Sequence, residues 1–197
     1  YEMASCLVGS EMCIRASSDI VGGSIVIKEN KEYAEKISYI QNAVGAIPSP
    51  FDCYLLTRSI KTLSVRMKQH NENAIAVSNF LTNHSKINKV FFPGIDERYK
   101  EVAAKQMDGF GGMMSFILDT NIDGVKSFLK NLNIFTLAES LGGVESLIEH
   151  PAIMTHASID PAIREKLGIS DTLLRISVGI EDVEDLIADL DQALSKI

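Results

Sequence analysis

The run from Phe135 to Ser158, FTLAESLGGVESLIEHPAIMTHAS, holds the residues best suited to chemistry. It begins as a strand that delivers Glu139 and Ser140 to a turn containing Gly142 and Gly143. Glycine lets a ligand approach the backbone closely because it has no side chain, so this turn is suited to binding an anion. A tight turn with a polar pair on its rim is the alternative, since such turns are common.

A second candidate is Arg175, which lies in the middle of an apolar strand, LLRISV. Leu174, Ile176 and Val178 alternate onto one face, which leaves Arg175 and Ser177 on the other. A guanidinium pairs with a carboxylate through two parallel charge-assisted hydrogen bonds. The partner is either a substrate carboxylate or, in a structural ion pair, one of the 26 acidic residues of the chain.

Two histidines in the first run, His150 and His156, are candidate metal ligands. Their six-residue spacing matches no zinc motif, so we interpret them as surface or hydrogen-bonded histidines. The sequence predicts no metal site.

The elements that position these residues follow from hydrophobic periodicity and capping signals. Ser49, Pro50 and Asp52 form a helix start with the features of a capping box. Strands are predicted at 24–28, 87–94, 111–118, 134–138 and 172–180, and helices at 30–43, 50–82 with a break around 58–61, 96–107, 122–131 and 181–197. From residue 87 onward this order predicts helices on one face of a mostly antiparallel sheet.

Composition limits the class of function. The chain has 197 residues, 46% of them hydrophobic and 23% charged, which is typical of a globular domain. A net charge of −7 argues against a nucleic-acid partner, and no apolar run reaches membrane-spanning length. Three cysteines without metal-ligand spacing favour a reducing, cytoplasmic compartment.

Four segments together resemble one known family. They are GAIPSPFDCYLLTRSIKTLSVRMKQH, GFGGMMSF, the run from Phe135 to Ser158, and GISDTLLRISVGIEDVEDLIADLDQAL. They look like the C-terminal half of the Cys/Met metabolism pyridoxal-phosphate-dependent enzymes, over about residues 18–197. Cystathionine γ-lyase, cystathionine β-lyase, cystathionine γ-synthase and methionine γ-lyase share much of this pattern, and the AESLGG and PAIMTHAS segments are most similar to the γ-lyase.

The resemblance implies an α/β fragment of the fold-type I pyridoxal-phosphate transferase fold. Residues 1–46 are then a remnant of the large cofactor-binding domain, 47–85 the connecting helices, and 86–197 the small C-terminal α/β domain. Members of the family bind amino-acid substrates and assemble as homotetramers.

The resemblance also implies chemistry. The parent enzyme is expected to use pyridoxal 5'-phosphate to cleave cystathionine to cysteine, 2-oxobutanoate and ammonia. The substrate-carboxylate arginine of the family falls on Arg175, an assisting serine on Ser140, a residue that tunes substrate choice on Glu139, and another pocket residue on Thr155. The alternatives are a cystathionine γ-synthase and a non-catalytic domain that binds amino acids.

The segment near the N-terminus departs from the family. Counting back from Ser18 and Asp19 places the Schiff-base lysine of the family on Met12, which cannot form an imine. The hydroxyl residues that hold the cofactor phosphate fall on Gly9 and Glu11. We expect residues 5–16, which resemble translated sequencing adapter, to be non-native sequence at a truncation, and the chain as it stands to be inactive and to bind the cofactor poorly.

Overall fold

The computed structural model describes residues 6–9, 20, 24–27 and 29–197. The chain divides into two compact units, residues 1–63 and 64–197. The boundary falls inside the segment 47–85, for which sequence predicted connecting helices, and the division into 1–46, 47–85 and 86–197 stays a prediction.

The first unit contains two strands and two helices. Strand β1 (Cys6–Gly9) pairs antiparallel with β2 (Ser24–Ile27), and helices α1 (Lys31–Val44) and α2 (Pro50–Ile60) follow. The predicted strand 24–28 is confirmed over 24–27, with residue 28 outside the described residues, and the predicted helix 30–43 is confirmed. Strand β1 lies in the segment 5–16, where no element was predicted. Met12 and Glu11 lie outside the described residues, so the expectations placed on them stay predictions.

Capping explains where the two helices of this unit begin. The Asn30 side chain accepts a hydrogen bond from the Tyr33 amide of α1. At α2, Ser49 Oγ accepts from the Asp52 amide at 3.1 Å, and the Asp52 carboxylate accepts from the Ser49 amide. Pro50 occupies the first turn, where no amide donor is needed. The predicted capping box is confirmed.

Replacing Ser49 by alanine is expected to destabilise the first turn of α2 by about 1 kcal/mol, because the Asp52 amide loses its acceptor. Amide hydrogen exchange at Asp52 measures the effect. Ser64→Ala is the matched control, since Ser64 is an exposed serine within α3 and caps no helix. Equal exchange at Asp52 in both variants would contradict the prediction.

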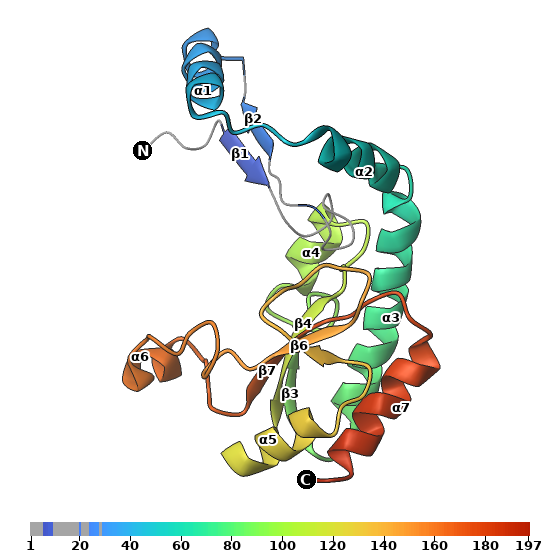
Figure 1. Cartoon of the computed structure of the whole chain (residues 1–197). Coiled ribbons are helices and arrows are strands. Elements are labelled where there is room, and N and C mark those ends of the chain that lie inside the picture. The colour runs from blue at the N-terminus through green and yellow to red at the C-terminus, as the bar shows by residue number, and fades with distance from the viewer. Residues whose placement is uncertain (1–5, 10–19, 21–23, 28) are drawn as a thin grey trace. The chain divides into compact units, whose positions relative to one another are not determined.

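The second unit is built on a five-stranded sheet (Figure 1). Its strands, in spatial order, are β3 (Ile87–Phe91), β4 (Met113–Leu118), β7 (Leu173–Ser177), β6 (Leu147–Glu149) and β5 (Thr136–Leu137). Neighbouring strands are antiparallel except β5 and β6, which are parallel. The predicted mostly antiparallel sheet is confirmed.

The helices from here on are α3 (Leu63–Asn83), α4 (Lys100–Gln106), α5 (Ile122–Lys130), α6 (Pro161–Lys166) and α7 (Val183–Leu194). Residues 61–62 separate α2 from α3, at the edge of the predicted break. The helix predicted at 96–107 begins later, at Lys100, after a series of turns. Strand β6 and helix α6 were not predicted. No described helix is long and apolar enough to span a membrane.

The core lies on one face of the sheet. Met114, Phe116 and Leu118 of β4 and Leu174 and Ile176 of β7 are buried, and they pack with apolar residues of α3, α5 and α7. Because side chains alternate along a strand, Ser115, Arg175 and Ser177 lie on the opposite face. The predicted split of β7 into an apolar face and a polar face is confirmed.

Helix α7 also fixes the entry to β5. Asp189 is buried, and its carboxylate accepts hydrogen bonds from the amides of Asn133, Ile134 and Phe135 at 2.8 to 3.1 Å. These three residues come directly before β5, which leads into the turn at Glu139. Asp189 therefore ties the segment that carries the candidate site to the helical layer.

Candidate functional site

The sheet register places one charged pair side by side. Arg175 of β7 lies opposite Glu149 of β6 on one flank and opposite Ser115 of β4 on the other. All three belong to the face that points away from the core. Glu149 is fully buried, whereas Arg175 is partly exposed.

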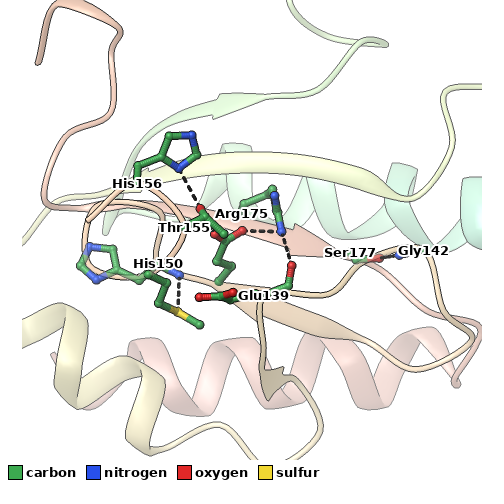
Figure 2. Close-up of polar contacts among 9 residues, drawn as sticks. Glu139, Gly142, His150, Thr155, His156, Arg175 and Ser177 are labelled. Atoms are coloured by element: carbon green, nitrogen blue, oxygen red, sulfur yellow. Dashed lines mark hydrogen bonds and ion pairs between the residues drawn. The ribbon is translucent and has the colours of Figure 1, made fainter. Parts of the chain in front are cut away.

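Arg175 contacts both Glu149 and the turn that begins at Glu139 (Figure 2). Its Nη2 atom forms an ion pair with Glu149 Oε2 and donates a 3.0 Å hydrogen bond to the Glu139 carbonyl oxygen. The Glu149 side chain is 1% exposed and that of Arg175 is 25% exposed. The structure thus contains the structural ion pair that sequence left open, and it places the same guanidinium at the turn.

The guanidinium keeps donors for a ligand. Both contacts of Arg175 use Nη2, and within the described part of the chain Nε and Nη1 have no hydrogen-bond partner. A guanidinium has five N–H donors, so the three on Nε and Nη1 have no acceptor among the described residues. A carboxylate is the acceptor that matches this planar fork best.

Thr155 joins the same network through Glu149. Its hydroxyl donates to Glu149 Oε1, and the Thr155 hydroxyl oxygen lies 2.8 Å from Nδ1 of His156. Each carboxylate oxygen of Glu149 therefore has one side-chain partner, Thr155 or Arg175. Sequence analysis missed Glu149. Its signal was an acid directly after the apolar residues Leu147 and Ile148, because an acid in such a position needs a cation or a hydrogen-bond donor beside it.

The turn at residues 139–143, called the bend below, lies beside Arg175. Glu139 and Ser140 are exposed, and Glu139 reaches Arg175 through its backbone carbonyl. The Ser140 side chain makes no hydrogen bond to any residue that the structure describes. Gly142 has a φ of +76°, a left-handed conformation that favours glycine, and its amide donates to Ser177 Oγ at 2.7 Å.

The histidines have structural partners. His150 is fully buried, and its Nε2 donates to the Asp171 carbonyl at 2.9 Å. Burial lowers the pKa of His150. The hydrogen bond to the Asp171 carbonyl raises this pKa by less, so burial favours the neutral ring. Among residues 29–197 and the described parts before them, no three metal-ligating side chains gather at one point.

Comparison with known proteins identifies the family. Residues 13–195 match the Cys/Met metabolism PLP-dependent enzyme family, which is more than half of the chain. The chain belongs to this family. Cystathionine γ-lyase from Dictyostelium discoideum is 52% identical over 93% of this chain, and cystathionine β-lyase from Coxiella burnetii is 50% identical over 92%.

Solved structures agree with this assignment. Cystathionine γ-synthase from Xanthomonas oryzae, in complex with aminoacrylate and cysteine, matches 98% of this chain with a TM-score of 0.89 and 45% identity. Cystathionine γ-lyase from Lactobacillus plantarum, complexed with L-serine, matches 98% with a TM-score of 0.88 and 41% identity. The predicted fold is confirmed: an α/β fragment that matches the C-terminal half of fold-type I PLP enzymes.

The chain spans about half the length of the relatives it matches, 47% of the Dictyostelium enzyme and 50% of the Xanthomonas chain. The described residues in the network of Arg175 include no lysine amino group, so they do not fit the covalent anchor of pyridoxal phosphate. The guanidinium of Arg175 matches the geometry of a carboxylate. We therefore derive no reaction step through the cofactor from these residues.

Proposed function

We propose that the chain is the C-terminal half of a PLP-dependent carbon–sulfur lyase that cleaves cystathionine to cysteine, 2-oxobutanoate and ammonia. The observation that carries the proposal is the partly exposed guanidinium of Arg175, whose Nε and Nη1 donors have no acceptor among the described residues and which lies beside an exposed polar bend. Family membership and the lyases among the most similar relatives support it. Assembly as a homotetramer and use of pyridoxal phosphate belong to the same proposal.

Each site residue has a proposed role. The Nε and Nη1 donors of Arg175 bind the α-carboxylate of the substrate, and Glu149 holds the guanidinium in place through Nη2. Ser140 adds a hydroxyl donor from the bend. The exposed Glu139 carboxylate contributes to substrate choice. Thr155 holds Glu149 in place through its hydroxyl.

Cystathionine γ-synthase activity is the second candidate. The observation in its favour is the match to the Xanthomonas enzyme, at a TM-score of 0.89 over 98% of this chain. Both reactions begin with an amino acid held by its carboxylate, so the site around Arg175 serves either one. Product analysis separates them.

A chimera tests the proposal. Residues 20–197 are joined to the N-terminal half of the Lactobacillus plantarum γ-lyase at the structurally matched position, with the intact enzyme as positive control. We expect 2-oxobutanoate and cysteine from cystathionine. Formation of cystathionine from an activated homoserine and cysteine favours the synthase, and pyruvate with homocysteine favours a β-lyase. A chimera that holds the cofactor yet turns over none of these substrates contradicts the proposed function.

A further inference from the structure

We propose that Ser177 is a positioning residue for the substrate-carboxylate site. Its hydroxyl fixes the bend so that Glu139 and Ser140 lie beside the guanidinium of Arg175. The inference rests on the proposed function, because it gives Ser177 a part in binding a ligand that Arg175 holds.

One strand holds the bend at both ends (Figure 2). Arg175 and Ser177 are two residues apart on β7, so their side chains leave the same face of the sheet. Arg175 Nη2 donates to the carbonyl of Glu139 at 3.0 Å, and Ser177 Oγ accepts from the amide of Gly142 at 2.7 Å. The distance between the two anchors is therefore set by the strand itself.

The backbone of Ser177 is well fixed. β7 lies between β4 and β6, and Ser177 pairs with Met113 on one side and Leu147 on the other. The serine is 3% exposed, so water has little access to replace its hydroxyl. The bend is therefore attached to a rigid central strand, β7.

The bend depends on this contact. Among the backbone amides of residues 139–143, that of Gly142 alone reaches a hydrogen-bond acceptor within the described part of the chain. Gly142 also has a left-handed backbone conformation. Glycine adopts other backbone conformations about as readily, so this one is not maintained once the bend is loosened. Without the hydroxyl, the carbonyl of Glu139 is left as the remaining link between the bend and β7.

Ligand binding depends on whether the bend is fixed by the Ser177 hydroxyl. Arg175 keeps its ion pair with Glu149 whether or not the bend is fixed, so the guanidinium stays in place. The exposed side chains of Glu139 and Ser140 lose their position, because they belong to the bend. Loss of the Ser177 hydroxyl therefore weakens ligand binding without removing the main charge contact.

The experiment uses the full 197-residue chain and L-cystathionine as the probe. Affinity is measured by titration calorimetry, and hydrogen exchange of the Gly142 amide is followed by NMR. We compare Ser177→Ala with Ser177→Thr, which restores the hydroxyl. Ser177→Val is a second test, since valine has the shape of threonine without the acceptor. Ser78→Ala is the control, because Ser78 is equally buried and its hydroxyl bonds within α3.

We expect Ser177→Ala and Ser177→Val to bind L-cystathionine about tenfold more weakly and to exchange the Gly142 amide faster, the size expected for one lost hydrogen bond. Ser177→Thr and Ser78→Ala keep the wild-type values. If wild type binds, Arg175→Ala does not, and both variants without the hydroxyl bind like wild type, the positioning role is wrong while the proposed function stands. If wild type itself fails to bind, the chain holds no carboxylate site by itself and the role of Ser177 fails, while the chimera decides the proposed function separately.

Discussion

Replacing Arg175 by alanine is expected to reduce the affinity of the chain for L-cystathionine by at least thirtyfold, or about 2 kcal/mol. The loss is large because charge-assisted hydrogen bonds from a guanidinium to a carboxylate are about twice as strong as neutral ones. Titration calorimetry on the folded chain measures it. Binding by Arg175→Ala at wild-type affinity would show that the carboxylate binds elsewhere.

The same substitution is expected to lower stability, because it leaves the buried Glu149 without its cation. Breaking a buried pair in this way costs about 3–5 kcal/mol. The double variant Arg175→Ala with Glu149→Gln removes both charges and keeps an acceptor for Thr155. We expect urea unfolding to show that the double variant regains most of the stability while its binding stays lost.

This double variant separates folding from recognition. If it recovers both stability and binding, the single variant failed by unfolding, and Arg175 does not hold the ligand. Lys126→Ala is the control, since Lys126 forms an ion pair with Asp123 in which both side chains are exposed. It is expected to leave binding and stability unchanged, because pairs in water contribute little.

Replacing Asp189 by alanine is expected to destabilise the second unit by about 3 kcal/mol at pH 7. Its carboxylate accepts from three backbone amides, and each charge-assisted hydrogen bond to a buried group contributes about 1.5–3 kcal/mol with partial compensation by water. Urea unfolding measures the change. Asp185→Ala is the control, since Asp185 is an exposed acid on the same helix.

The effect of Asp189 is also expected to depend on pH. Burial raises the pKa of Asp189, but the amides of Ile134, Asn133 and Phe135 and the side chain of Gln192 outweigh it, so the pKa lies below its ordinary value. A lowered pKa in the folded state stabilises the protein above the unfolded pKa of about 3.9. That stability is lost as pH falls through the folded pKa. The difference between wild type and Asp189→Ala should therefore shrink in acid, and a difference that stays constant below pH ~4 would contradict this account.

Local patterns predicted several parts of the structure correctly. The capping box at Ser49 and Asp52 is a contact between near neighbours, so the sequence contains all of its information. The two faces of β7 follow from alternation along a single strand, which placed Arg175 opposite the core side chains. The helix predicted at 181–197 is likewise present, as α7.

Other features depend on residues far apart in the chain. Strand β6 has three residues and no alternation, because all three are buried, so periodicity does not mark it. Its Glu149 becomes the partner of Arg175 through the register with β7, which no local pattern specifies. The hydrogen bond from Gly142 to Ser177 joins residues 35 positions apart. Sequence therefore placed the candidate site on β7 and the bend, and the structure supplied the contacts between these two segments.

The most direct test follows the side chain of Arg175 during ligand binding. Its Nε–H signal in an NMR spectrum is assigned by its absence from Arg175→Lys, and L-cystathionine is then titrated into the wild-type chain. The account predicts a saturable shift of this signal that follows the same binding curve as the amides of the bend, because Nε has no hydrogen-bond partner among the residues that the structure describes. Movement of other signals while Nε–H stays unchanged would contradict it.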